Sequence, residues 1–135
     1  MIQLNHIGIA VDDLGRMEKL FSILGMKISE VEDVPEQGVR AHFLPLQGAA
    51  GRLELLEGVD PNGTIAKFLK SRGPGIHHLS FLLPKGKLQQ VSDTLRNEGF
   101  RLIYSEPKQG AHQMRVNFIH PATCGGILIE VMEPS

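Results

Sequence analysis

The feature that most constrains the fold is one pattern of secondary structure that occurs twice along the chain. A strand, a helix and three further strands are predicted in residues 4–58, and the same order returns in residues 75–133. The landmarks keep their separation: His6 and His78 lie 72 residues apart, and Glu54 and Glu130 lie 76 apart. The sequence therefore predicts one domain over residues 1–135, built from two internal repeats.

The expected elements follow from hydrophobic periodicity and from turn residues. In the first repeat, strands are expected at residues 4–11, 26–32, 39–46 and 52–57, with a helix that begins after Asp12 or Asp13 and ends at Gly25. In the second repeat, a helix runs from about Lys87 to Glu98, and strands are expected at residues 76–83, 101–105, 114–120 and 126–132. Between the repeats, "GTIAKFLKSRGPG" predicts a short helix that ends in a turn. The predicted fold class is α+β, with two tandem βαβββ modules that form a cupped, mixed eight-stranded sheet around a metal site.

In each repeat, a histidine of the first strand and a glutamate of the last strand occupy aligned positions, His6 with His78 and Glu54 with Glu130. Glu54 and Glu130 both stand in apolar runs, "GRLELLEG" and "GGILIEVME", where a buried carboxylate costs several kcal/mol unless it is paired, protonated or bound to a cation. Two imidazoles and two carboxylates suit a divalent ion such as cobalt, zinc, manganese or nickel. The alternative is a solvent-facing glutamate and an ordinary hydrogen-bonded histidine in each strand. The alignment of the pairs His6–Glu54 and His78–Glu130 favours the metal site.

Charge and cysteine content exclude other classes of function. The net charge of −1 gives no basic field for nucleic acid or an anionic membrane surface. The single cysteine indicates a reducing compartment, and the first residues show no signal-peptide pattern, so a cytoplasmic location is expected.

Several stretches of the sequence resemble the methylmalonyl-CoA epimerases, which belong to the vicinal-oxygen-chelate superfamily with glyoxalase I and the extradiol dioxygenases. The resemblance runs from about His6 to Glu133. It is carried by "HIGIAVDDL", "EQGV", "TIAKFL", "PGIHHLSF", "VNFIHP" and "GGILIEV". It implies an acyl-CoA thioester substrate, a homodimer and one divalent metal ion, with the metal ligands at His6, Glu54, His78 and Glu130. Of the adjacent histidines His77 and His78, the resemblance selects His78.

The chemistry implied by the resemblance is removal of the acidic α-proton of a malonyl thioester and its return to the other face. Inversion most simply needs a base on each face of the substrate. Some family members carry an acid three residues after the glycine of "EQGV", but this chain has Ala41 there. Glu54 and Glu130 are therefore the candidate catalytic bases. Arg115, Asn117 and His120 are further candidates, for substrate binding.

Two alternatives stay open for the function. The same four ligands would serve a glyoxalase I, which moves a proton between adjacent carbons of a glutathione hemithioacetal. A metal-free small-molecule-binding module of the same fold is the other alternative, although such a module has no need of four aligned ligands. The motifs "TIAKFL" and "FIHPATCGG" favour the epimerase.

Overall fold

The computed structural model describes residues 2–46 and 51–135, and it divides the chain into two compact units. One unit is His6–His77. The other unit contains the described residues before His6 together with His78–Ser135. Within the described residues, no helix is long and apolar enough to cross a membrane. Each unit is built around one βαβββ module.

The first module runs from residue 3 to residue 58. Its strands are ordered β2-β3-β4-β1, with β1 parallel to β4 and the other neighbours antiparallel. Its elements are β1 (Gln3–Ala10), α1 (Leu14–Ile23), β2 (Glu30–Val34), a 3-10 turn (Pro35–Gln37), β3 (Val39–Pro45) and β4 (Arg52–Gly58).

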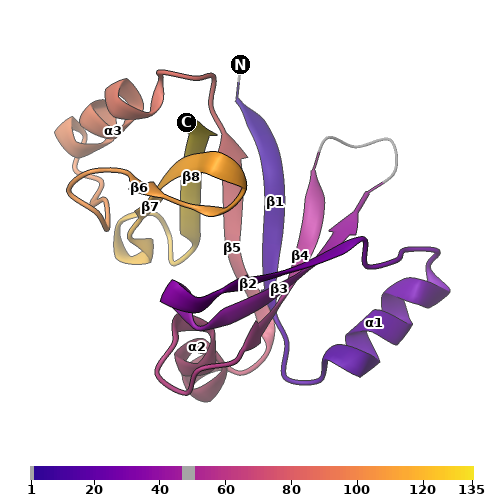
Figure 1. Cartoon of the computed structure of the whole chain (residues 1–135). Helices are drawn as coiled ribbons and strands as arrows, with labels where there is room; N and C mark the ends of the chain where they lie inside the picture. Colours follow the sequence, from indigo (N-terminus) through magenta and orange to yellow (C-terminus); the bar gives the residue numbers. More distant parts are fainter. Residues whose placement is uncertain (1, 47–50) are drawn as a thin grey trace. The chain divides into compact units, whose positions relative to one another are not determined.

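The two helices of the first unit pack on opposite faces of these strands. Helix α1 packs on a cluster formed by Val11, Leu44 and Leu55. Helix α2 (Thr64–Arg72) inserts Ile65 into a cluster on the other face that includes Ala41. In Figure 1, α1 lies to the right of β3 and β4, and α2 lies to their left. Since adjacent residues of a strand point to opposite faces, β3 and β4 contribute side chains to both clusters.

The ends of α1 show why the second strand begins later than expected. Asp13 caps the helix, because its Oδ1 accepts the backbone N–H of Arg16 at 3.1 Å. At the other end Gly25 adopts φ +88°, and the N–H of Met26 bonds to the carbonyl of Phe21 at 2.8 Å. The predicted strand 26–32 is therefore wrong at its start. Met26 belongs to the helix cap, and β2 begins at Glu30.

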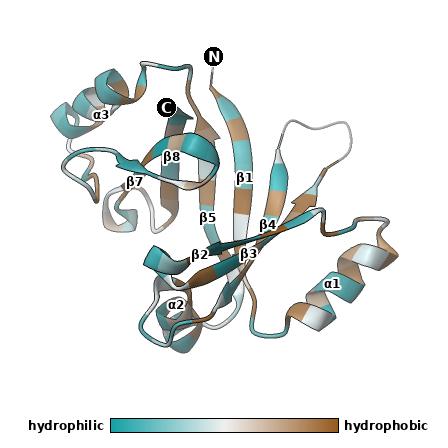
Figure 2. Ribbon diagram, viewed as in Figure 1, coloured by the Kyte–Doolittle hydropathy of each residue, from teal (hydrophilic) through white to brown (hydrophobic). Residues whose placement is uncertain are grey.

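The second module repeats the same order with the strands β5-β8-β7-β6. Its helix α3 packs through Leu88 and Val91 against Leu83 and Val131, and Figure 2 shows α3 as mostly hydrophilic with isolated hydrophobic residues. The elements are β5 (Gly75–Leu82), α3 (Leu88–Asn97), β6 (Lys108–Gln109), β7 (Met114–Ile119) and β8 (Leu128–Pro134), with 3-10 turns at Ala111–Gln113 and Pro121–Thr123.

The predicted strand at residues 101–105 is wrong. This segment makes one isolated bridge, Leu102 to Ile119, and its backbone is otherwise bonded by side chains. Asn117 accepts the N–H of Tyr104 at 3.1 Å and donates to its carbonyl at 3.0 Å, while Arg96 donates to the carbonyls of Tyr104 and Ser105. These contacts replace a strand ladder, and the short strand β6 follows instead.

The other elements agree with the sequence to within two residues at each end. The predicted α+β class and the two tandem βαβββ modules, with eight strands among the described residues, are confirmed. The interpretation as a single domain over residues 1–135 stays a prediction.

Asn117 allows a test of this local structure. Its side chain is fully buried, so Asn117→Ala would leave the N–H of Tyr104 without its partner and the carbonyl of Tyr104 with Arg96 alone. The free energy of unfolding should fall by about 2 kcal/mol, measured by urea denaturation. Asn97→Ala, at the exposed end of α3, is the control and should change it by less than about 0.5 kcal/mol. Equal effects of the two changes would contradict this role of Asn117.

Candidate active site

The candidate site residues occupy equivalent positions in the two modules. In the first module, the parallel pairing of β1 with β4 places His6 opposite Arg52 and Gly8 opposite Glu54. In the second, β5 and β8 place His78 opposite Leu128 and Ser80 opposite Glu130. Paired residues of neighbouring strands share a face, so each module carries its histidine and its glutamate on one face.

In the first module this face, the His6 face, holds a buried contact between a histidine and a glutamate. His6 and Glu54 are 5% and 7% exposed, and His6 Nδ1 lies 3.0 Å from Glu54 Oε2. The same oxygen accepts Arg52 Nη2 at 2.9 Å and Nε at 3.1 Å. The guanidinium also lies over the ring of Phe43, 4.9 Å from its centroid. Arg52 therefore compensates the buried charge of Glu54 within its own module.

In the second module the equivalent pair has a different environment. His78 and Glu130 are each 8% exposed, and His78 Nε2 lies 4.0 Å from Glu130 Oε1. Phe118, which pairs with Glu130 across the strands, packs edge-on against His78 with ring centroids 6.4 Å apart. Leu128 stands where Arg52 stands in the first module. The two glutamates are therefore chemically different although their backbone positions correspond.

The adjacent histidine His77 belongs to the other face of β5. Its ring packs edge-on against Phe68 of α2 with centroids 5.0 Å apart. Burial lowers the pKa of His77 below its ordinary value, so the ring is neutral at pH 7. His77 is therefore a neutral ring that packs against α2, on the face of β5 away from His78.

Two of the three predicted substrate-binding residues lie on the face that α3 covers, away from Glu130. Arg115 Nη1 bonds Glu133 Oε1 at 3.1 Å, and Glu133 in turn accepts the N–H of Leu88 at the start of α3. Asn117, as described above, fixes the loop at Tyr104. Both side chains therefore have structural partners on the face opposite Glu130.

The third predicted residue, His120, directly follows β7 and precedes the 3-10 turn Pro121–Thr123. Strand alternation places it on the face that carries Phe118 and Glu130. Its Nδ1 accepts the backbone N–H of Ala122 at 3.1 Å, so in the neutral ring the proton is on Nε2. His120 can therefore offer an N–H donor on the Glu130 face.

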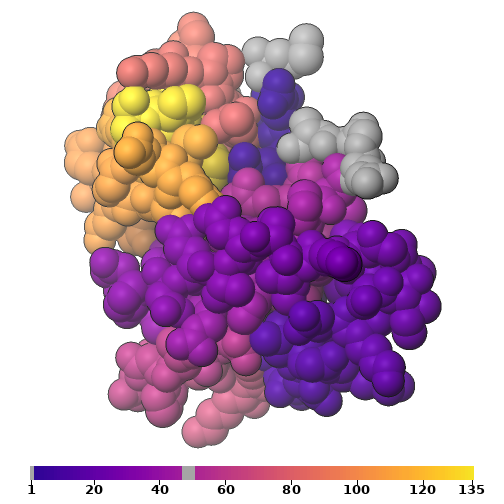
Figure 3. All heavy atoms as spheres, turned by 45° about the vertical axis from the view of Figure 1, so that its right-hand side comes forward, coloured from indigo at the N-terminus to yellow at the C-terminus, as the bar shows by residue number. Residues whose placement is uncertain are grey.

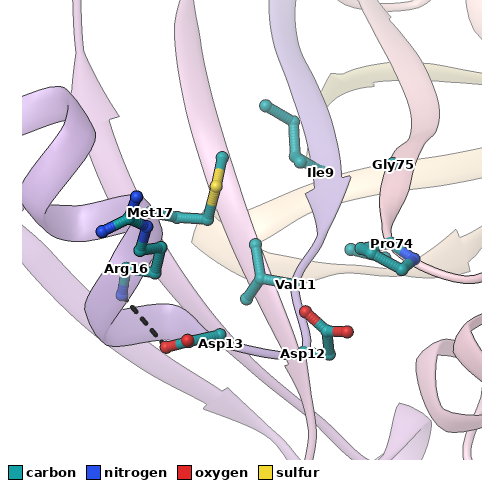
Figure 4. A pocket seen from close by; sticks show the side chains of 9 residues that line it. Ile9, Val11, Asp12, Asp13, Arg16, Met17, Pro74 and Gly75 are labelled. Carbon is teal, nitrogen blue, oxygen red and sulfur yellow. Dashed lines mark hydrogen bonds between the residues drawn. The ribbon is translucent and has the colours of Figure 1, made fainter.

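A pocket of about 270 Å³ lies in the first unit, on the face opposite His6 (Figure 4). Its walls include Ile9 of β1, Val11 just after that strand, Met17 of α1 and Pro74. The helix-capping bond that the N–H of Arg16 donates to Asp13 lies beside it. Strand alternation separates this pocket from the candidate site, since Ile9 and Val11 point away from His6 and Gly8.

Sequence reasoning missed Arg52. The signal was present, because Arg52 precedes Glu54 by two residues and strand alternation puts both on one face. The sequence does not determine the register between β1 and β4, which also places Arg52 opposite His6.

The amino-acid sequence matches a known family of proteins and resembles individual members of it. The family model of the glyoxalase/bleomycin resistance protein/dioxygenase superfamily matches residues 5–118. The mitochondrial methylmalonyl-CoA epimerase of Homo sapiens is 35% identical over 131 residues, which cover 96% of this chain and 72% of the human protein.

Two solved structures extend the comparison. The methylmalonyl-CoA epimerase of Mycobacterium tuberculosis has a TM-score of 0.88 at 39% identity, covering 98% of this chain and 88% of that one. A methylmalonyl-CoA epimerase in complex with methylmalonyl-CoA and NH4+ has a TM-score of 0.85 at 31% identity, covering 100% and 96% of the two chains. The chain therefore belongs to the glyoxalase/bleomycin resistance protein/dioxygenase superfamily and, within it, to the methylmalonyl-CoA epimerases.

Proposed function

We propose that this protein is a metal-dependent epimerase that interconverts the two C2 epimers of methylmalonyl-CoA. The observation that carries the proposal is the buried histidine–glutamate pair that occurs at equivalent positions of both modules, His6–Glu54 and His78–Glu130. The substrate is taken from the epimerases that this chain is similar to over nearly its whole length.

The four side chains fit one divalent ion by their chemistry. Two imidazoles and two carboxylates are donors that cobalt, zinc, manganese and nickel accept, and all four residues are buried. We propose that His6, Glu54, His78 and Glu130 hold the ion together. When bound, it would act as a Lewis acid that stabilises the negative charge of a thioester enolate.

We assign the two glutamates different roles. An adjacent guanidinium favours the ionised form of a carboxylate and weakens its ability to take up a proton. Since Arg52 makes two contacts to Glu54, we favour Glu54 as an anionic ligand over the role of a base that the sequence also suggested. Glu130 has Leu128 where Glu54 has Arg52, and we propose that Glu130 carries a proton to or from carbon 2 of the substrate.

His120 is the residue we propose for orienting the substrate. Its Nε2–H is a donor on the Glu130 face, and a carboxylate or thioester oxygen of the acyl group is a suitable acceptor. A homodimer and a cytoplasmic location remain proposals of the same kind, the second because a chain with one cysteine suits a reducing compartment.

The function is tested by solvent exchange. Metal-loaded protein in heavy water should incorporate deuterium at carbon 2 of methylmalonyl-CoA and should convert either pure epimer into the mixture. Mass spectrometry measures the exchange, and chiral analysis of the acyl group measures the inversion. Fully metallated protein that catalyses neither reaction would contradict the proposal.

The metal ligands are tested by metal retention. His78→Ala and Glu130→Ala should each lower the affinity for cobalt or zinc by at least about tenfold. Loss of a residue that only hydrogen-bonds a metal ligand already lowers metal affinity by about ten- to a hundredfold, and loss of the ligand itself should lower it at least as much. His77→Ala is the matched control and should keep the affinity of the original protein. The metal content after dialysis against a weak chelator measures the difference. Normal retention in His78→Ala with loss in His77→Ala would reverse the choice between these histidines.

A further inference from the structure

The acyl group of methylmalonyl-CoA carries a free carboxylate beside its thioester. His120, the side chain assigned to this group so far, offers the N–H of a neutral ring, which does not offset a negative charge. A carboxylate that is withdrawn from water needs a cation or several hydrogen bonds to compensate it. Resting on the proposed function, we therefore look for a cation close to the proposed metal ligands.

Arg52 is the cation of the His6 face. Strand alternation gives this face three acids of the first unit, Glu30, Glu32 and Glu54, and the register of β2 against β3 places Glu32 opposite Ala41. Among the residues that the described strands of this unit contribute to the face, Arg52 is the one lysine or arginine. An anionic acyl group on this face would be repelled by the acids and attracted by Arg52.

The guanidinium of Arg52 is held by buried side chains. Its Nη2 and Nε lie 2.9 Å and 3.1 Å from Glu54 Oε2, and its central carbon lies 4.9 Å from the ring centroid of Phe43. Phe43 is 4% exposed, whereas the side chain of Arg52 is 28% exposed. Figure 3 shows atoms in the magenta of β3 and β4 at the visible surface. The charged group is therefore fixed by its neighbours and still accessible to a ligand.

One edge of the guanidinium is left for a ligand. Its Nε and Nη2 contact Glu54, and its Nη1 has no polar contact within residues 2–46 and 51–135. The edge formed by Nη1 and Nη2 carries two parallel N–H groups, which is the geometry that binds both oxygens of a carboxylate. Since Glu54 and Phe43 already hold the side chain, a ligand on this edge would cost little further side-chain entropy.

We propose that Arg52 binds the free carboxylate of the acyl group through this edge and selects 2-carboxyacyl thioesters over thioesters that lack the carboxylate. Removal of the α-proton places a second negative charge on the acyl group, next to the carboxylate. A cation bonded to the carboxylate reduces the repulsion between the two charges. Arg52 thus contributes to specificity and, in the reaction proposed above, to the stability of the enolate.

Methylmalonyl-CoA and propionyl-CoA test this role, because the two thioesters differ by the carboxylate alone. In Arg52→Gln, the affinity for methylmalonyl-CoA should fall about ten- to a hundredfold, which is the effect of losing a hydrogen bond to a charged group. The affinity for propionyl-CoA should stay that of the original protein. Isothermal titration calorimetry measures both dissociation constants.

Arg40→Gln is the matched control. Arg40 lies on β3, on the face away from His6, where its Nε donates to Asp33 Oδ1 at 2.7 Å. Its replacement should leave both affinities unchanged. Each titration is made with the metal ion present and again after its removal, so that a difference in metal content cannot imitate the loss of Arg52.

Arg52→Lys decides the question if Arg52→Gln does not fold. Lysine keeps a positive charge beside Glu54 but lacks the planar fork that binds two oxygens. The affinity for methylmalonyl-CoA should fall about two- to tenfold, which is the effect of losing one hydrogen bond, and the affinity for propionyl-CoA should not change. An unaltered preference for methylmalonyl-CoA in this variant would then overturn the role of Arg52.

The outcomes separate this role from the proposed function. Equal losses of affinity for both thioesters in Arg52→Gln, an unchanged affinity for methylmalonyl-CoA, or an original protein without preference between the two would overturn carboxylate binding by Arg52. None of these results touches the epimerase reaction. Conversely, a protein that neither exchanges nor inverts methylmalonyl-CoA, but loses its preference for it in Arg52→Gln, would overturn the epimerase and keep Arg52 as a binding residue.

Discussion

The candidate site depends on the parallel pairing of the first and last strands of each module. This pairing brings a histidine near the start of the repeat next to a glutamate about 50 residues later, on one face and within reach of each other. A shift of one residue in either register would turn the glutamate to the opposite face, where α1 or α3 packs on apolar side chains. The helices therefore hold the register, because they bury the residues that alternate with the site.

The two modules share this backbone arrangement but differ in the charge around the glutamate. Arg52 and Phe43 enclose Glu54 with a cation that is held over an aromatic ring, whereas Leu128 and Phe118 occupy the corresponding positions in the second module. An internal repeat can thus supply a symmetric set of ligands together with chemically unequal acids. In the function we propose, this inequality separates an anionic ligand from a proton carrier.

The sequence predicted the elements that have strong periodicity and clear caps. It failed at residues 101–105, because "RLIYS" has the composition of a strand while its backbone bonds go to the side chains of Asn117 and Arg96. The same contact explains the unexpected position of Asn117, whose place in a strand did not reveal that its amide is bonded to the backbone of a distant loop. Met26 was assigned to a strand for a similar reason, because the backbone bond that ends α1 is not visible in its hydropathy.

By itself, the sequence determined the repeat of two βαβββ modules, the positions of the histidine and the glutamate in each, and the fact that both glutamates stand among apolar residues. These properties depend on local periodicity and on spacing along the chain. Only the tertiary structure decided that Arg52 bonds to Glu54, that Arg115 bonds to Glu133, and that Glu32 lies opposite Ala41. The last two of these depend on strand register, which is fixed by the packing of side chains from different elements and is not encoded in any one segment.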